Sequence, residues 1–282
     1  MVISMNDSKG AKGIKTVFIT GASSGIGREA AKLFQKKGWN VIATMRKPEL
    51  EQELSTFCNV RVVRCDVTEL ESIKQAVEGA VKEFGGIDVL VNNAGYYTVG
   101  TLEEASSEQI KRQLDTNLLG LIETTKAVLP YFRKQRSGVI INLSSIAGIV
   151  SIPLQSLYHA TKFAVEGFSE SLQYELEPFR IRVKLIEPGT IKTEFCGRSM
   201  IVTEDVSKGE YKEYKSRVIG NLVKSGNNGS RPEGVAKKIY QAATDGRKRM
   251  RYATGKMNKI TVLKKIFPLR AYQRIVKIML QA

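Results

Sequence analysis

The chain has few of the residues that build metal sites, disulfide frameworks or membrane spans. Among 282 residues there are three cysteines, one histidine and one tryptophan. Cys58, Cys65 and Cys196 form no Cys-x-x-Cys pair, so we expect reduced thiols and a cytoplasmic protein. His159 is the only histidine and offers zinc almost no partner ligands, so we predict no metal site. No apolar run reaches the roughly 18 residues of a membrane span, and residues 1–16 are too polar for a signal peptide.

Positive charge is concentrated toward the end of the sequence. The formal net charge is +16, and residues 231–282 hold fourteen of the 44 Lys and Arg but only two of the 28 Asp and Glu. The preceding part of the chain is therefore close to electrical balance. A basic tail without interleaved aromatic residues is not typical of proteins that bind single-stranded nucleic acid. We expect no nucleic-acid partner.

The apolar residues follow the pattern of an α/β protein. Short β-branched runs alternate with longer amphipathic stretches, which predicts a doubly wound parallel sheet of about seven strands with helices on both faces. Six strands are expected at residues 16–20, 40–44, 60–64, 87–91, 139–143 and 182–186. Helices are expected at 25–37, 69–84, 107–135 and 154–177.

One domain accounts for most of the chain. We predict a single catalytic domain over residues 1–255 and a basic amphipathic extension over 256–282. Residues 190–230 are polar and contain the run Gly226-Asn227-Asn228-Gly229. We interpret them as a substrate-loop insertion, either a lid or a flexible stretch, before regular helix resumes at Pro232.

A glycine-rich turn follows the first predicted strand directly. It reads Thr20-Gly21-Ala22-Ser23-Ser24-Gly25-Ile26-Gly27 and leads into a helix. Glycines at these positions permit a tight turn and close backbone approach, and a helix N-terminus offers free N–H groups and partial positive charge. The turn predicts a site for the diphosphate of a dinucleotide.

Further short motifs follow this turn in a fixed order. They are Asp66-Val67, Asn92-Asn93-Ala94-Gly95, Asn117, Ser145, Tyr158-x-x-x-Lys162 and Pro188-Gly189. With the Gly-x-x-x-Gly-x-Gly turn, they make roughly residues 14–195 resemble the short-chain dehydrogenase/reductase family, whose members have the Rossmann fold. The stretch 158–167 is similar to hydroxysteroid and retinol dehydrogenases. The resemblance implies a homodimer or homotetramer that pairs through the helices at 107–135 and 154–177.

The resemblance also implies a cofactor site. Asp66 and Val67 would contact adenine, residues 93–95 would line the adenosine side, and residues 188–193 would hold the nicotinamide carboxamide. The residues alone leave a second interpretation of Asp66, as a carboxylate that caps the turn near Thr68. The complete predicted set is Gly21, Ser23, Ser24, Gly25, Ile26, Gly27, Arg46, Asp66, Val67, Asn93, Ala94, Gly95, Tyr158, Lys162, Pro188, Gly189, Ile191 and Thr193.

The end of the second predicted strand favours NADP(H) over NAD(H). A carboxylate there accepts hydrogen bonds from the ribose 2′-hydroxyl, whereas a 2′-phosphate requires positive charge. This strand ends with Met45 and Arg46, and Lys47 follows. A guanidinium binds phosphate in bidentate fashion, and the Ser23 hydroxyl can add a hydrogen bond. The alternative is that Arg46 and Lys47 are solvated loop charges.

Tyr158 and Lys162 predict the chemistry. They are four residues apart in a helical stretch, so their side chains share one face. A tyrosine with a pKa near 10 is a poor base at neutral pH, and an adjacent ammonium favours the phenolate. With a nicotinamide that exchanges hydride, Tyr158 would donate or accept the proton of a carbonyl or alcohol oxygen. The family assigns Lys162 to the nicotinamide ribose and Asn117 to a proton-relay water.

Two neighbouring hydroxyls compete for a role beside Tyr158. The family's usual separation between its serine and tyrosine matches Ser145 rather than Ser144, and Ser145 would hydrogen-bond the substrate oxygen. His159 is adjacent to Tyr158, but successive helical residues point about 100° apart, so we assign it a structural role.

Apolar residues just before Tyr158 predict a hydrophobic wall and hence an apolar, steroid-like ketone or secondary alcohol. They are Ile149, Val150, Ile152, Pro153, Leu154 and Leu157. Packing within the core would give the same composition. A second hypothesis is an NADP(H)-binding sensor of the same fold without turnover, although a sensor needs no proton donor.

The tail beyond Pro268 has an apolar stripe opposite a basic face. The stripe comprises Leu269, Tyr272, Ile275, Val276, Met279 and Leu280. Such a helix can contact an anionic membrane surface. The alternative, which we favour, is that the stripe packs on its own domain or on a partner subunit and covers the substrate cleft.

Overall fold

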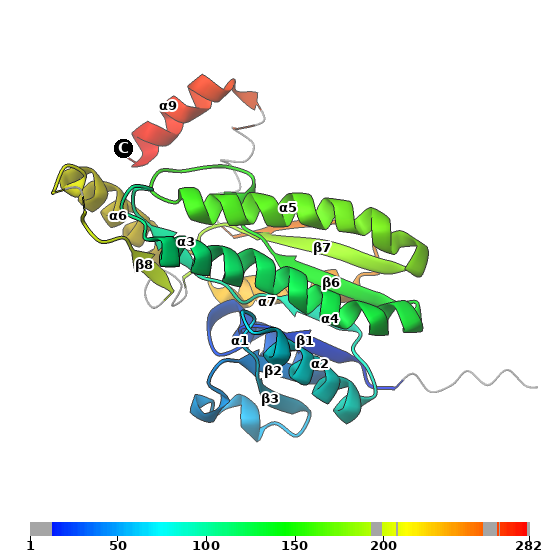
Figure 1. Ribbon diagram of the computed structural model, residues 1–282. Helices are drawn as coiled ribbons and strands as arrows, with labels where there is room; N and C mark the ends of the chain where they lie inside the picture. Colours follow the sequence, from blue (N-terminus) through cyan, green and yellow to red (C-terminus); the bar gives the residue numbers. More distant parts are fainter. Residues whose placement is uncertain (1–12, 193–198, 207, 256–263, 265, 281–282) are drawn as a thin grey trace, which may run out of the picture.

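Seven parallel strands form the centre of the protein. The computed structural model describes residues 13–192, 199–206, 208–255, 264 and 266–280 (Figure 1). The strand order is β3-β2-β1-β4-β6-β7-β9, and all neighbouring pairs are parallel. The strands are β1 Thr16–Ile19, β2 Asn40–Met45, β3 Val60–Arg64, β4 Val89–Asn92, β6 Gly138–Leu143, β7 Ile181–Pro188 and β9 Arg251–Thr254. The predicted α/β class is confirmed, and all six located strands are present; β9 is the seventh.

Helices cover both faces of the sheet (Figure 1). Alternate residues of β1 explain why two layers are needed: Val17 and Ile19 pack in a core with α1 and α7, whereas Phe18 packs in a second core with α2, α4 and α5. Because side chains alternate along a strand, both faces of β1 are buried. The helices are α1 Gly25–Lys36, α2 Leu70–Phe84, α4 Gly120–Gln135, α5 Ser156–Leu176 and α7 Pro232–Thr244.

Short helical turns complete these layers. The helix predicted at 107–135 begins as α3 Ser107–Leu114, continues through the π-helical turn η3 Asp115–Leu119 and leads into α4. Ser106 and Gln109 cap α3 reciprocally. The 3-10 turns are η1 Pro48–Leu50, η2 Leu54–Thr56, η4 Ile146–Gly148 and η5 Glu177–Phe179.

The segment predicted to be irregular between 190 and 230 contains a helix, so that prediction was wrong in part. The helix is α6 Lys212–Asn227, and β8 Met200–Val202 pairs with β5 Tyr97–Val99. Glu104 and Lys215 attach α6 to the domain through a buried ion pair of 2.7 Å. Because α6 buries only a few side chains and has Gly220 within it, its apolar periodicity is weak. The segment's predicted role as a substrate loop stays a prediction.

The amphipathic tail forms α9 Leu269–Leu280, which lies at the top of Figure 1 and contacts α6. Tyr272 and Val276 are buried with Val150, and the Tyr272 hydroxyl donates to the carbonyl oxygen of Ser151. The stripe therefore packs, through these two residues, on its own domain, as in the alternative that we favoured. The predicted domain boundary at 255–256 adjoins residues 256–263, which lie outside the described part of the chain. Within the described residues, no helix is long and apolar enough to cross a bilayer.

A buried ion pair joins β7, α7 and β9. The Lys184 ammonium donates to Asp245 at 2.7 Å and to the Tyr252 hydroxyl at 2.9 Å, and Tyr252 donates to Asp245 at 2.6 Å. Burial opposes ionisation of Asp245, but the bonds from Lys184 and Tyr252 outweigh it and lower the Asp245 pKa to about 2. Since an unfolded Asp titrates near 4, ionised Asp245 stabilises the fold above that pH, and the stabilisation is lost as pH falls toward 2.

Asp245→Asn is therefore expected to lower the free energy of unfolding by about 3 kcal/mol at pH 7, because Lys184 loses its buried counter-charge. Urea denaturation at pH 7 and pH 3 measures this, and the difference from the unmodified protein should shrink at pH 3. Glu123→Gln, which removes an exposed pair with Lys126, is the control and should change the free energy by less than about 1 kcal/mol. Equal effects of the two substitutions would contradict the prediction.

Candidate active site

A cavity of about 1890 Å³ opens at the carboxyl ends of the strands. Pockets for one small ligand usually occupy roughly 300–1,000 Å³, so there is room for a dinucleotide and a second molecule. It lies where the strand order reverses between β1 and β4, the usual ligand position in such sheets. The predicted residues that line it are Gly21, Ser23, Ser24, Gly25, Ile26, Arg46, Asp66, Val67, Asn93, Ala94, Gly95, Asn117, Ser145, Tyr158, Lys162, Pro188, Gly189 and Ile191. Gly27 does not line it, and Thr193 lies outside the described residues.

The glycine turn is shaped by close backbone contacts. Gly21 and Gly25 have φ angles of +66° and +56°, which favour glycine. A Cβ on Gly27 would lie 2.4 Å from Asn93 Nδ2 and 2.5 Å from the Gly21 carbonyl oxygen. Asn93 Nδ2 in turn donates to the carbonyl oxygens of Thr20 and Gly21, both at 2.9 Å. Gly27 therefore contributes through its lack of a side chain, although it does not line the cavity. It lets the start of α1 pack against Gly21 and Asn93, with the N-terminus of α1 directed at the cavity.

The end of β2 presents positive charge. Met45 is buried, whereas Arg46 is exposed and lines the cavity. Across the described ranges, Arg46 forms no ion pair with a carboxylate. Opposite it, Asp66 Oδ1 accepts from the backbone N–H and the hydroxyl of Thr68 at 3.0 and 2.8 Å. Asp66 therefore caps a turn and lines the cavity at once, which fits both interpretations of this residue.

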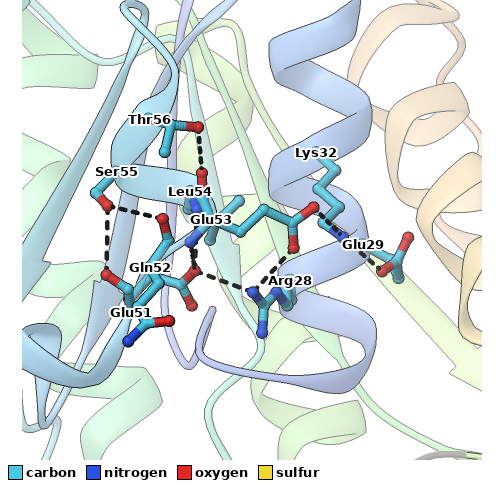
Figure 2. Close-up of polar contacts among 9 residues, drawn as sticks. All are labelled: Arg28, Glu29, Lys32, Glu51, Gln52, Glu53, Leu54, Ser55 and Thr56. Atoms are coloured by element: carbon cyan, nitrogen blue, oxygen red, sulfur yellow. Dashed lines mark hydrogen bonds and ion pairs between the residues drawn. The ribbon is translucent and has the colours of Figure 1, made fainter.

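Arg28 and Glu51 also line the cavity, although no sequence motif predicted them. Figure 2 shows their polar contacts: Arg28 Nη2 lies 3.0 Å from Glu51 Oε1 and 2.9 Å from Glu53 Oε2, and Lys32 lies 2.7 Å from Glu53. Glu51 also accepts from the backbone N–H groups of Glu53 and Leu54. The charge of Arg28 is balanced within this cluster, whereas Arg46 and Lys47, which also line the cavity at the end of β2, form no ion pair among the described residues. The sequence feature that could have indicated Arg28 as a cavity residue is its position directly after Gly27.

Tyr158 and Lys162 lie side by side in the first turns of α5. Lys162 Nζ is 5.7 Å from the centre of the Tyr158 ring and donates to the Leu143 carbonyl oxygen at 2.6 Å. Both side chains are buried. Burial lowers the pKa of Lys162 to about 8, and the Glu166 carboxylate opposes this effect. A buried ammonium thus lies beside the Tyr158 ring, as the spacing predicted.

The two serines after β6 have different surroundings. Ser145 Oγ accepts from the backbone N–H of Ala147 at 3.1 Å and donates to the Pro188 carbonyl oxygen at 3.4 Å. Ser144 Oγ lies deeper, where it would be 2.7 Å from a Cβ on Gly148. Because Ser145 bridges η4 and the end of β7, it is held toward the nicotinamide end predicted at Pro188. This geometry favours Ser145 over Ser144 for the contact with a substrate oxygen.

Asn117 lies in the π-helical turn η3. Its side chain pairs with the backbone of Tyr96: Tyr96 N–H donates to Oδ1 at 3.1 Å, and Nδ2 donates to the Tyr96 carbonyl oxygen at 2.8 Å. Nδ2 also lies 3.4 Å from the Thr161 hydroxyl. Such turns are frequent at functional sites. Asn117 therefore joins the end of β4 to α5, and its role with a relay water stays a prediction.

His159 holds the loop that follows η4. Its Nδ1 donates to the Ala147 carbonyl oxygen at 2.8 Å, and its Nε2 accepts from the Ile152 N–H at 3.0 Å. Burial lowers the His159 pKa, so the neutral ring is favoured. Both ring nitrogens are used within the fold, which fits the structural role that we predicted.

Part of the cavity wall is apolar. Of the predicted wall, Val150 and Ile152 line the cavity, whereas Ile149, Pro153, Leu154 and Leu157 do not. Residues that come from distant parts of the chain complete it: Tyr96, Tyr97, Ile201, Leu222 and Val276. Val276 brings α9 to the cavity, so the tail forms part of its wall.

Comparison with known proteins identifies the family. A model described as short chain dehydrogenase matches residues 15–200. The chain is 42% identical to 3-ketodihydrosphingosine reductase of Bacteroides thetaiotaomicron, over 77% of this chain and 78% of that protein. It is 38% identical to retinol dehydrogenase 8 of Bos taurus, over 70% of this chain and 64% of that protein.

Solved structures agree with this match. A short-chain dehydrogenase from Streptomyces avermitilis is 30% identical with a TM-score of 0.83, over 95% of this chain and 98% of that one. A serine dehydrogenase complexed with NADP+ is 31% identical with a TM-score of 0.74, over 85% and 94%. The chain therefore belongs to the short-chain dehydrogenase/reductase family of oxidoreductases.

Proposed function

We propose that this protein is an NADP(H)-dependent oxidoreductase that interconverts a carbonyl and a secondary alcohol on an apolar, steroid-like substrate. The observation that carries the proposal is one cavity in which Arg46 lies at one end, Ser145, Tyr158 and Lys162 lie together, and an apolar wall follows. A dinucleotide has the length to join such a cationic end to a proton donor. Solved relatives with NADP bound support the choice of cofactor.

The chain's own residues fit this cofactor. The N-terminus of α1 would hold the diphosphate, because Ser24 at its N-cap makes no side-chain cap bond and its first N–H groups face the turn. Arg46 and Ser23 would hold the 2′-phosphate, Asp66 and Val67 the adenine, and residues 188–191 the carboxamide. When bound, the nicotinamide supplies or accepts hydride.

Four side chains would transfer the proton or stabilise the charge on the substrate oxygen. In reduction, Tyr158 gives the proton of its hydroxyl to the substrate oxygen, and in oxidation the phenolate takes it back. The Lys162 ammonium stabilises the phenolate and binds the ribose. Ser145 hydrogen-bonds the substrate oxygen and stabilises the charge that develops there. Asn117 positions the water through which the proton is replaced.

The apolar wall supports a hydrophobic substrate. Val150, Ile152, Leu222 and Val276 present hydrocarbon to the end of the cavity beyond Tyr158, and burial of such a surface against a ligand is favourable. The names of two relatives, 3-ketodihydrosphingosine reductase and retinol dehydrogenase 8, denote a ketone and an alcohol as substrates. We further propose a cytoplasmic homodimer or homotetramer that pairs through α3, α4 and α5. Contact of α9 with a membrane surface remains a hypothesis, and it would have to use the side of α9 that faces away from Tyr272 and Val276.

The test is nicotinamide absorbance with purified protein and a panel of ketones and secondary alcohols. We expect kcat/KM with NADPH to exceed kcat/KM with NADH. We also expect kcat/KM to be higher for apolar ketones than for small polar ones. Equal kcat/KM for the two cofactors would overturn the NADP(H) assignment. Tight NADPH binding without turnover of any carbonyl would instead favour the sensor hypothesis.

A further inference from the structure

Three acidic side chains meet one arginine where β9 approaches α5. Arg251 Nη1 contacts Glu166 and lies 2.6 Å from Glu187 Oε1, and its Nη2 lies 2.5 Å from Glu170 Oε1. The side chains of Glu166 and Glu187 are only 8% and 6% exposed, against 55% for Glu170. Two buried carboxylates therefore share one guanidinium, and either would be costly to bury without a cation beside it.

The two buried carboxylates come from two different elements that line the candidate active site. Glu166 follows Lys162 by four residues in α5, so the two side chains share a face of the helix. Glu187 directly precedes Pro188 in β7, at the end where the carboxamide is expected. Gly189 N–H donates to the Thr254 carbonyl oxygen at 2.8 Å, so β9 also holds the backbone there. Arg251 thus connects the turn of α5 that bears Lys162 with the cofactor end of β7.

The space around Glu166 is closed. A Cβ on Gly148 would lie 2.7 Å from Ser144 Oγ, 2.9 Å from Glu166 Cγ and 2.9 Å from the Lys162 carbonyl oxygen. η4, which carries Gly148, therefore packs against α5 at van der Waals distance. A shift of Glu166 would be transmitted to Ser145 as well as to Lys162, because a close-packed interior has few gaps to absorb it.

We propose that Arg251, Glu166 and Glu187 form a clamp that positions Lys162 and Ser145 against the cofactor end of β7. They are positioning residues, since they act through these neighbours. The catalytic consequence rests on the proposed function, whereas the clamp itself is a property of the fold.

The clamp also affects the charge of Lys162, in addition to its position. Around Glu166 the charged groups are Lys162 and Glu170 on α5, Glu187 on β7 and Arg251 on β9. Burial raises the Glu166 pKa, and the Ser144 hydroxyl and Arg251 oppose this. The Glu166 carboxylate raises the Lys162 pKa against the effect of burial. Without that carboxylate, Lys162 would lose its proton at lower pH. Because the ammonium is proposed to bind the cofactor ribose, ketone reduction would then be lost at lower pH, so its alkaline limb would move in that direction.

The experiment compares Glu166→Gln, Glu187→Gln and Arg251→Lys with Glu170→Gln as the matched control. We expect Glu187→Gln and Arg251→Lys to reduce kcat with NADPH by about tenfold to a hundredfold, the cost of a small misplacement of reacting groups. Glu166→Gln should move the alkaline limb to lower pH, and Glu170→Gln should leave kcat and the pH profile unchanged. If Glu166→Gln and Glu187→Gln match the control in both measurements, the clamp has no catalytic role and the proposal fails.

Hydrogen exchange of the full chain gives a readout that does not need turnover. Loss of the clamp in Glu187→Gln should increase exchange of amides in 158–166 and 186–191, relative to Glu170→Gln. If the unmodified protein reduces no carbonyl, the proposed function fails, and exchange still tests the clamp. Equal exchange in the two variants overturns it. Should Arg251→Lys fail to fold, Glu187→Gln keeps the Arg251–Glu166 pair and carries the test.

Discussion

Tyr158→Phe is expected to reduce kcat for ketone reduction by about a hundredfold or more while NADPH still binds, because the ring remains and only the proton donor is lost. The Tyr158 ring packs in a small cluster with Tyr97 and Ala147, and phenylalanine preserves that packing. Steady-state kinetics with NADPH and an accepted ketone, together with NADPH fluorescence titration, measure the two properties separately.

Tyr174→Phe is the matched control. Tyr174 is on the same helix and 78% exposed, so the same loss of a hydroxyl should leave kcat unchanged. Retention of most activity in Tyr158→Phe would refute its role as proton donor. Loss of NADPH binding together with activity would show that Tyr158 acts mainly through the cofactor.

Arg46→Asp is expected to reverse the cofactor preference. It removes the guanidinium proposed for the 2′-phosphate and introduces a carboxylate that repels phosphate but accepts hydrogen bonds from a 2′-hydroxyl. Hydrogen bonds to charged groups contribute about 1.5–3 kcal/mol, so kcat/KM with NADPH should fall by roughly tenfold to a hundredfold. The kcat/KM with NADH should stay constant or rise.

Arg61→Asp controls for the change in net charge. Arg61 is on the neighbouring strand β3, pairs with Glu83 and does not line the cavity. Its substitution should leave the ratio of the two kcat/KM values as it is in the unmodified protein. An unchanged ratio in Arg46→Asp would place the 2′-phosphate contact elsewhere, with Ser23 or Lys47 as the next candidates.

Sequence patterns predicted the sheet well because its central strands are buried on both faces. Runs rich in Val, Ile and Leu, such as residues 139–143, are typical of strands in that position. β9 was not located because Arg251 and Thr254 interrupt its apolar pattern; it is held by Tyr252 inside the core and by backbone pairing with β7. α6 was missed for a related reason, since its apolar residues Val218, Ile219 and Leu222 are interrupted by Gly220 and follow a buried Lys215 that pairs with Glu104.

The candidate site was predictable where chemistry requires a fixed spacing. The spacing of Gly21, Gly25 and Gly27 follows from the close approach of the turn to the start of α1. The spacing of Tyr158 and Lys162 is that of one helical turn. The wall of the cavity was less predictable, since Tyr97, Leu222 and Val276 come from three distant segments. Only the folded chain brings them together, and no local pattern marks such residues.

The position of β9 has a consequence for synthesis. Parallel strands with no partner on one side expose backbone groups that can pair with other chains. Until residues 251–254 leave the ribosome, β7 has no neighbour on its outer side, although all but one of its residues are buried in the finished fold. Release of β9 therefore covers the outer edge of β7 and supplies Arg251 to two carboxylates in the same step. Covering of β7 and charge pairing of Glu166 and Glu187 are thus one late event.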